Sequence, residues 1–459
     1  MNFNRRDFLK LSAVLPFENS ARADTVPQLE IISRVLEVKG KSAKVFGIVG
    51  PGGKPGLSMV YGAPFRATLK NSISVPTAIH WHGLTPPVAF DGVPMLVGAP
   101  LAAGESRDYE FPNQKIGTHW MHSHLGLQEQ QLLAAPLIVH ETATPVFDEQ
   151  EHVVMLHDFT FRDPAEILAE LNASGGAHAH HMKMGGMDMG GMAMGSDVKY
   201  DALLANDRTL DDPEIVSVDK GGRVRLRLIN AAAATNMWVE LGALNAKVIA
   251  VDGNAVKPLT VSRFPLAIAQ RVDLRLQLPN ETGAWPILFE SEGDTLRSGI
   301  ILNAGDATVK KLSDQGKAGA ALDLKFESTL RVPYDLKKSE VTQREMVRLT
   351  GGEKNYQWGF NGKAMMHDTL FKVKQGTRVE ITMRNVTTMA HPMHLHGHYF
   401  QVTAINGKRF EGALRDTVLI PGSESVSIQF EADNPGLWAF HCHHLYHMNS
   451  GMMAAMGYG

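Results

Sequence analysis

Ten histidines lie in four short clusters, two in the first third of the chain and two in the last third. The clusters are His80-Trp-His82, His122-Ser-His124, His391-Pro-Met-His394-Leu-His396 and His441-Cys-His443 with His447. In a β-strand, side chains two residues apart point to the same side, so each His-x-His segment can present two imidazoles to one site. Imidazole is a common ligand of copper. The clusters therefore predict a copper centre built from distant parts of the sequence.

Cys442 is the only cysteine in the 459 residues and lies inside the fourth cluster. A single cysteine forms no intramolecular disulfide, and a lone thiol outside the cytosol is reactive unless something occupies it. A thiolate with two imidazoles and a distant thioether is the ligand set of a blue-copper electron-transfer site. Cys442, His447 and Met452 are spaced for one loop to fold around a metal, and His391 can supply the second imidazole.

Three ten-residue segments predict the strands that lead to these clusters. Each begins with Gly and ends with Asn, and apolar and polar residues alternate between them, which is the period of a half-buried strand. The segments span residues 62–71, 221–230 and 376–385. This repetition predicts three similar units in tandem. Because short alternating strands with Gly and Pro turns are typical of antiparallel β-sandwiches, we expect an all-β protein of three sandwich domains.

The middle unit differs from the outer two in the residues that follow its segment. Nine residues beyond the final Asn, the outer units have His80-Trp-His82 and His394-Leu-His396, whereas the middle unit has Val239-Glu-Leu241. Only the outer units can therefore bind metal between them, and the middle unit is expected to hold them in register. We expect the domains at residues 24–145, 146–310 and 311–459, with a Met- and His-rich insertion at about 175–195 in the second.

The first 23 residues predict an export signal. Arg5-Arg6 is followed by Phe8-Leu9-Lys10, a short apolar stretch and Ala21-Arg22-Ala23, which matches a twin-arginine signal with a cleavage site after Ala23. We therefore expect recognition by the twin-arginine export machinery and a periplasmic location. Twin-arginine export carries folded proteins, which suits a protein that must guard its metal during loading.

Charge and hydrophobicity exclude two classes of partner. The formal net charge is −3, which gives no reason to expect nucleic acid binding. No apolar run approaches the roughly 20 residues that a membrane-spanning helix needs. The sequence therefore predicts no membrane span, and we expect a monomer.

The four clusters, in the longer motifs HWHG, HSH, HPMHLHG and HCHHLYHMNSGM, resemble the signature of the multicopper oxidases. The resemblance covers essentially the whole chain beyond the signal. It implies three tandem cupredoxin-like Greek-key β-sandwich domains, four copper ions, and the reduction of dioxygen to water with electrons from a donor. Because Cys442 stands between His441 and His443, electrons would have a short covalent route from one copper site to the other.

The resemblance also implies how the ligands are shared among the coppers. The type 1 copper would take His391, Cys442, His447 and Met452. The type 2 copper would take His80 and His394. The type 3 pair would take His82, His122, His124, His396, His441 and His443.

Two carboxylates are candidates for supplying protons to the oxygen-reducing site. Asp91 follows the first motif and matches a family position for a carboxylate near the three coppers of types 2 and 3. The alternative is that Asp91 is a turn residue. Many relatives have Glu directly after the last type 1 histidine, but Met448 occupies that position here. Glu129 is a possible replacement, with ordinary surface chemistry as the alternative. The histidines outside the clusters, such as His398 and His444, are expected to be structural.

The Met- and His-rich segment bears on the electron donor. Its soft ligands are Met182, Met184, Met187, Met189, Met192 and Met194, with His178, His180 and His181. Thioethers suit Cu(I) better than Cu(II). With the motifs HSHLGLQEQ and HCHHLYHM, this segment resembles the bacterial copper-resistance oxidases, which implies a cuprous oxidase. A laccase-like oxidase of phenols and aromatic amines is the alternative, and a copper-binding protein without turnover is a third possibility.

Overall fold

The computed structural model describes residues 26–94, 96–112, 115–143, 147–174, 196–336, 339–352, 356–364 and 368–459. The expected export signal and the Met- and His-rich segment lie outside these residues. In the described chain the strands form six sheets, two in each of three successive parts, which confirms the prediction of an all-β protein.

The first domain packs two four-stranded sheets, in the orders β2-β1-β4-β6 and β3-β8-β7-β5. Its elements are β1 (Gln28–Val38), β2 (Lys41–Val49), η1 (Pro51–Gly53), β3 (Leu57–Val60), β4 (Phe65–Asn71), β5 (Ile79–His82), η2 (Val88–Phe90), β6 (Ser106–Phe111), β7 (Gly117–Ser123), η3 (Gln128–Gln131) and β8 (Ala134–His140).

The middle domain packs a six-stranded sheet, β10-β9-β12-β17-β14-β15, against a five-stranded sheet, β11-β19-β18-β13-β16. Its elements are β9 (Gln150–Phe159), α1 (Pro164–Ser174), β10 (Ala202–Ala205), β11 (Glu214–Val218), β12 (Arg223–Asn230), β13 (Met237–Glu240), β14 (Ala246–Val251), β15 (Asn254–Val261), β16 (Arg263–Leu266), β17 (Arg271–Gln277), β18 (Gly283–Ser291) and β19 (Arg297–Ala304).

The third domain follows α2 (Lys325–Thr329) and packs the sheet β21-β20-β23-β29-β25-β26, to which β27 is added on β25, against β22-β31-β30-β24-β28. Its elements are β20 (Val341–Gly351), β21 (Trp358–Phe360), β22 (Thr369–Val373), β23 (Arg378–Asn385), β24 (His391–Leu395), β25 (Phe400–Ile405), β26 (Lys408–Arg409), β27 (Leu414–Arg415), β28 (Thr417–Ile420), β29 (Ser425–Glu431), β30 (Leu437–Cys442), α3 (Leu445–Asn449) and β31 (Met453–Tyr458).

The three repeated segments form β4, β12 and β23, and the asparagine that ends each one has the same role. Asn71, Asn230 and Asn385 are fully buried. Each side-chain amide donates to a backbone carbonyl of the following loop and to one of a more distant segment, Leu101, Leu266 or Ile420. Each side-chain oxygen accepts from the backbone N–H two residues later. The asparagine thus fixes the loop that leads to the next strand, β5, β13 or β24.

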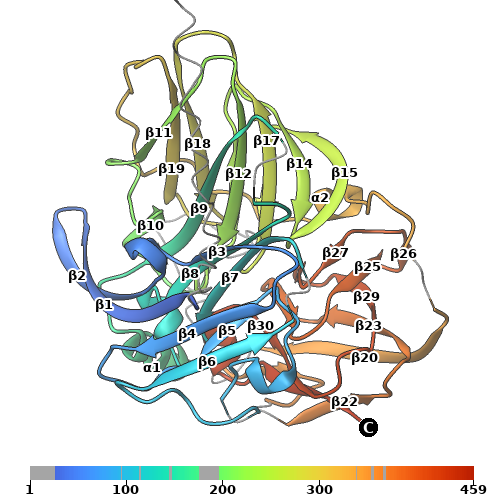
Figure 1. The fold of residues 1–459 in the computed structure, drawn as a ribbon. Coiled ribbons are helices and arrows are strands. Elements are labelled where there is room, and N and C mark those ends of the chain that lie inside the picture. The colour runs from blue at the N-terminus through green and yellow to red at the C-terminus, as the bar shows by residue number, and fades with distance from the viewer. Residues whose placement is uncertain are drawn as a thin grey trace, which may run out of the picture.

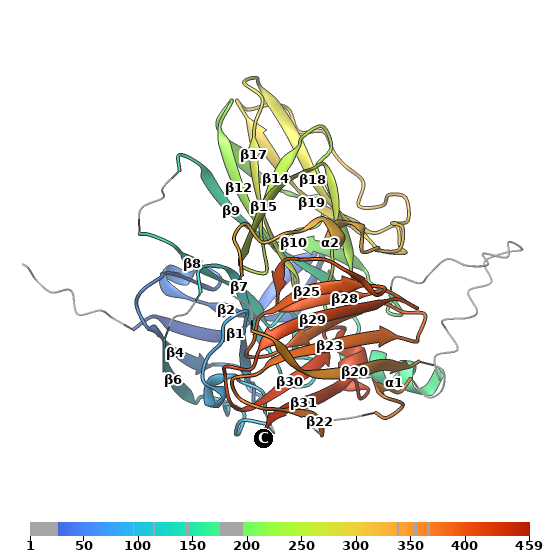
Figure 2. The same cartoon turned by 90° about the vertical axis from the view of Figure 1, so that its right-hand side faces the viewer.

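The three domains meet around β7 (Figures 1 and 2). The first and third domains lie side by side, and the middle domain, coloured green to yellow, stands against both. Strand β7 of the first domain contacts β12 and β17 of the middle domain. One large hydrophobic core runs through the middle and third domains, and a second fills the first domain. Among the described residues, no helix combines the length and hydrophobicity of a membrane span.

Candidate metal centre

Two pairs of antiparallel strands, one in each outer domain, bring eight histidines together. Strands β5 and β7 place His80 opposite His122, and β24 and β30 place His394 opposite His441. The other histidine of each cluster follows two residues later. All eight are buried, with at most 7% of the residue exposed. The eight are His80, His82, His122, His124, His394, His396, His441 and His443, and several groups of three have ligand atoms within 4.8 Å of one another.

Backbone carbonyls determine which ring nitrogen faces inward. The Nδ1 atom of His80 lies 3.0 Å from the carbonyl oxygen of Asp91, and Nδ1 of His394 lies 2.8 Å from that of Asp416. A carbonyl can only accept a hydrogen bond, so these Nδ1 atoms carry the protons and the Nε2 lone pairs face inward. The two Nε2 atoms lie 3.4 Å apart across the domain boundary. Two lone pairs at this distance repel each other, whereas a metal ion between them would be bound by both.

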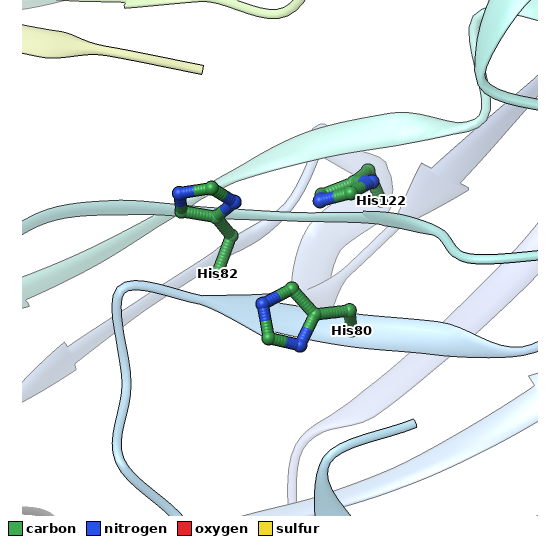
Figure 3. A group of neighbouring side chains, drawn as sticks. All are labelled: His80, His82 and His122. Atoms are coloured by element: carbon green, nitrogen blue, oxygen red, sulfur yellow. The ribbon is translucent and has the colours of Figure 1, made fainter. Parts of the chain in front are cut away.

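His82 is oriented the other way round. Its Nε2 atom lies 3.1 Å from Oδ1 of Asp416, and its Nδ1 atom has no hydrogen-bond partner among the described residues. Nε2 of His122 and Nε2 of His443 also have no hydrogen-bond partner among the described residues. Figure 3 shows His80, His82 and His122 around a common space. Buried polar atoms are rarely unpaired, so three unpaired ring nitrogens in one cluster fit bound copper.

Burial keeps His82, His122 and His394 neutral, as metal ligands must be. Desolvation, followed by the charge of neighbouring imidazoles, lowers the pKa of His82, His122 and His394 well below the usual value. Desolvation likewise lowers the pKa of His441 to about 4. No proton therefore has to leave these rings at neutral pH before copper binds.

A second site lies entirely within the third domain. The Sγ atom of Cys442 lies 3.6 Å from Nδ1 of His391 and 3.8 Å from Nδ1 of His447, and the two Nδ1 atoms are 3.3 Å apart. All three residues are fully buried. Burial raises the pKa of the Cys442 thiol, so a bound cation is what would make it a thiolate. The geometry matches the ligand triangle predicted from the spacing.

Packing distinguishes Met452 from the methionines beside it. Met452 is fully buried in the same hydrophobic cluster as Cys442 and Trp358. Met448 and Met453 pack in a different cluster. The Cys442 backbone N–H also donates to the carbonyl of Met452 at 3.1 Å. Met452 therefore remains our predicted axial ligand.

Three family models, each described as Multicopper oxidase, match residues 33–144, 150–307 and 339–458, one for each sandwich. The chain belongs to the multicopper oxidases. This family binds copper and uses oxygen, and its cupredoxin-like three-domain fold is the fold described above.

Curated relatives include copper-resistance proteins and laccases. The multicopper oxidase MmcO of Mycobacterium tuberculosis is 29% identical over 91% of this chain and 83% of its own length. Copper resistance protein A of Escherichia coli is 24% identical over 98% of this chain and 94% of its length. Laccase-2 of Botryotinia fuckeliana is 25% identical over 82% of this chain and 72% of its length.

Solved structures share the fold of this multicopper oxidase. Fet3p, described as a multicopper oxidase that functions in iron import, has a TM-score of 0.78 at 19% identity, covering 94% of this chain and 90% of its own. The laccase of Botrytis aclada has a TM-score of 0.77 at 22% identity, covering 94% and 86%.

The two predicted carboxylates both lie against the eight-histidine cluster. Asp91 is buried, and its Oδ2 atom lies 2.9 Å from Nδ1 of His396. Glu129, on η3, is buried, with Oε2 3.0 Å from Nδ1 of His122 and Oε1 3.7 Å from Nδ1 of His443. Burial, with the charge of Asp158, raises the pKa of Glu129 well above its usual value. Glu129 is therefore not a surface residue.

Sequence reasoning missed Asp197, which lies beside the second site. Its Oδ2 atom is 3.5 Å from Nε2 of His447, and its Oδ1 atom is 3.2 Å from Nε2 of His444. Although burial alone would raise it, these histidines lower the pKa of Asp197 well below its usual value. His444, which we expected to be structural, stacks on His447 with ring centroids 3.7 Å apart. No regular spacing connects residue 197 to the fourth cluster, so only the fold reveals this contact.

Sequence reasoning also missed Asp416 and Arg271. Asp416 contacts His82 with its side chain and His394 with its carbonyl oxygen. Arg271 belongs to β17 of the middle domain and donates to both Asp416 carboxylate oxygens. The middle domain therefore does more than hold the outer domains in register, although none of the histidines that the structure describes in it joins the two clusters.

A cavity of about 350 Å³ lies on the third domain beside the eight-histidine cluster. Gly397, His398 and Tyr399 line this cavity and also line a smaller one, whose other walls include His80, His394 and Asp416. Neither cavity is lined by the residues of the Cys442 site. Both lie on the side of the eight histidines.

Proposed function

We propose that this enzyme is a cuprous oxidase, which oxidises Cu(I) to Cu(II) and passes the electrons to dioxygen. Bound copper supplies the redox chemistry: one-electron oxidation of the donor and four-electron reduction of dioxygen to water. The export signal predicted at the N-terminus would bring the enzyme to the periplasm, where this activity would detoxify copper.

We assign four resident coppers to the two sites. His391, Cys442, His447 and Met452 hold the type 1 copper, and His80 with His394 hold the type 2 copper. The type 3 pair is held by His82, His122, His124, His396, His441 and His443.

The remaining site residues handle the proton and electron routes. Cys442 would hold the electron-accepting type 1 copper, and its neighbours His441 and His443 would give the electrons a short covalent route to the eight-histidine cluster. Asp91 and Glu129 are the carboxylates beside that cluster, and we assign them to proton delivery. Glu129 takes the place of the glutamate that position 448 lacks.

The contact between Asp197 and His447 is the observation that carries the choice of donor. Met194, the last methionine of the Met- and His-rich segment, precedes Asp197 by three residues in the chain. Asp197 lies against His447 and His444. The chain that follows the Met- and His-rich segment therefore contacts His447, which we assign to the type 1 copper. Thioethers favour Cu(I), and a carboxylate at this edge suits a cationic donor.

Two further observations support Cu(I). His391 and His447 are fully buried. A bulky phenol would be served by a wide cleft over His391. In addition, several relatives are named copper resistance proteins.

The alternative is a laccase-like enzyme that oxidises phenols and aromatic amines, which the laccases among the relatives favour. A copper-binding protein without turnover is disfavoured, because all ten cluster histidines and Cys442 are present and buried together.

The test compares kcat/KM for Cu(I) and for a bulky phenol, by oxygen uptake, in the fully copper-loaded enzyme and in a variant lacking residues 178–194. We expect the deletion to lower Cu(I) oxidation much more than phenol oxidation. A matched variant with the six methionines replaced by leucine keeps the segment length and should reproduce the loss. Equal losses for both donors, or a wild-type preference for the phenol, would favour the laccase alternative.

A further inference from the structure

Arg271 connects the middle domain to the eight-histidine cluster. The side chain is fully buried. Its Nη1 atom donates to Oδ1 of Asp416 at 2.7 Å, and its Nη2 atom donates to Oδ2 at 2.5 Å. Two further hydrogen bonds fix the guanidinium: Nε donates to the carbonyl of Thr118 at 3.2 Å, and Nη1 donates to the carbonyl of Ala269 at 3.0 Å. A bidentate pair fixes both the position and the plane of the carboxylate.

Asp416 in turn contacts two histidines with different parts of the residue. Its Oδ1 atom accepts from Nε2 of His82 at 3.1 Å, which puts the ring proton on Nε2 and leaves Nδ1 free. Its carbonyl oxygen accepts from Nδ1 of His394 at 2.8 Å, which leaves Nε2 free. One residue therefore selects opposite ring nitrogens in two histidines.

Gly83 makes room for this arrangement. The residue follows His82 and has a φ of 91°, a conformation that favours glycine. A Cβ atom at this position would lie 2.5 Å from Nη2 of Arg271 and 3.4 Å from Oδ2 of Asp416. His119 Nδ1 would lie equally close, at 2.5 Å, so the glycine that ends the first histidine motif makes room for both the middle-domain arginine and His119.

We propose that Arg271 is a positioning residue for the eight-histidine copper cluster, acting through Asp416 on His82 and His394. The middle domain, whose described residues contribute no histidine to the cluster, then determines which nitrogen of His82 faces the metal. The proposal rests on the assignment of His82 and His394 as copper ligands made above.

The test uses Arg271→Gln, Arg271→Lys and the control Arg227→Gln in the copper-loaded protein. Arg227 is a matched choice, because it is also a buried middle-domain arginine, pairs with Asp273 at 2.8 Å and donates to the same Thr118 at 2.9 Å. Its bonds go to no candidate ligand. The measurements are copper content, the type 1 and type 2 signals in electron paramagnetic resonance, and thermal unfolding of the copper-free protein.

We expect Arg271→Gln to weaken copper binding at the cluster by about tenfold and to alter the type 2 signal, while the type 1 signal is unchanged. Arg271→Lys keeps the charge but not the bidentate geometry, so its type 2 signal should lie between those of wild type and Arg271→Gln. Arg227→Gln should lower the thermal stability of the copper-free protein as much as Arg271→Gln does, and it should leave both signals as in wild type.

Wild-type copper content and signals in Arg271→Gln would overturn the proposal, as would an equal change of the type 2 signal in Arg227→Gln. If Arg271→Gln does not fold, Asp416→Asn replaces it, because its amide has the same shape and can donate to His82 Nε2, which would reverse the tautomer of His82. Wild-type copper content of the eight-histidine cluster in Asp416→Asn would then overturn the proposal. A wild-type protein that binds no copper at the cluster would instead contradict the ligand assignment itself.

Discussion

The two candidate copper sites are built in opposite ways. The Cys442 site takes all its candidate ligands from the third domain, within residues 391–452, and lies in one continuous hydrophobic core. The eight-histidine cluster takes four residues from each outer domain. Across the boundary, the Nε2 atoms of His80 and His394 lie 3.4 Å apart, as do those of His124 and His441. The first site needs one folded domain, whereas the second needs two domains in the correct relative position.

The side chains that surround the two sites also differ. At the Cys442 site, the aromatic ring of Trp358 stacks on His447 at 4.0 Å, and Asp197 provides one acidic contact. At the histidine cluster, carboxylates hold several rings at their outer nitrogens: Asp91, Glu129 and Asp416. Packing therefore orients the Cys442 site, whereas buried charges orient the eight-histidine cluster.

Cys442→Ser should separate the two sites most completely. The variant removes the thiolate, so we expect the blue type 1 absorption to disappear and turnover with any donor to fall to the level of the copper-free protein. Because the serine is similar in size, the histidine cluster should still bind its copper. Copper content and visible absorption check this. Loss of all copper from the variant would show that the two sites do not form independently.

Acid should destabilise the copper-free protein strongly. Burial lowers the pKa of His441 and His398 to about 4 and that of His447 to about 3. It also lowers the pKa of other cluster histidines, among them His82 and His122, well below 6.5. The unfolded chain regains ordinary histidines, so it binds more protons than the folded chain between about pH 6.5 and pH 4, and stability falls as the pH falls through this window. Each such histidine contributes up to ~1.4 kcal/mol per pH unit.

Buried acids with raised pKa values, among them Asp252 at about 6 and Glu129, act in the opposite direction but are fewer. Urea unfolding of the copper-free and copper-loaded protein from pH 7 to pH 5 measures the effect, and the loaded protein should be less sensitive. Equal stability of the copper-free protein at pH 7 and pH 5 would contradict neutral buried histidines.

Glu129→Gln should impair only the oxygen-reducing site. Because Glu129 contacts His122 and His443, we expect oxygen reduction to slow about 10- to 100-fold, with reduction of the type 1 copper by the donor unchanged in the absence of oxygen. Stopped-flow measurement of the two half-reactions separates them. Glu214→Gln is the control, because Glu214 also pairs with a histidine, His152 at 3.1 Å, away from both sites. A slower donor half-reaction in Glu129→Gln would weaken the comparison.

Asn230→Ala should have the smallest effect on the coppers. The buried side chain makes two donor bonds and one acceptor bond in the middle domain, so its loss should cost about 2–3 kcal/mol of unfolding free energy. Asn385→Ala removes the equivalent clamp before His391 and His394 and should also change both copper signals. Urea unfolding and copper spectra compare the two variants. Matching spectra would mean that the clamp does not position the histidines.

The sequence was sufficient to predict the parts of the molecule that repeat or have fixed spacing. The three Gly-to-Asn segments predicted three sandwiches, and the His-x-His pairs predicted rings that meet, because both signals depend on strand periodicity. Glu129 was expected with equal weight to be a surface residue, and the fold buries it beside His122.

Residues that act across domains could not be predicted in this way. Arg271 and Asp416 are separated by 145 residues, and Asp197 and His447 lie in different domains. Their contacts depend on how the domains pack, and no local pattern encodes them. The Met- and His-rich segment lies outside the described residues, so its role remains the prediction made from its composition.

The most direct test of this account is a crystal structure of the copper-loaded enzyme with anomalous diffraction measured at the copper absorption edge. The account predicts one copper peak among His391, Cys442 and His447 and three peaks among the eight histidines at the boundary of the outer domains. Fewer than three peaks within the histidine cluster, or a cluster peak bound by one outer domain alone, would contradict it.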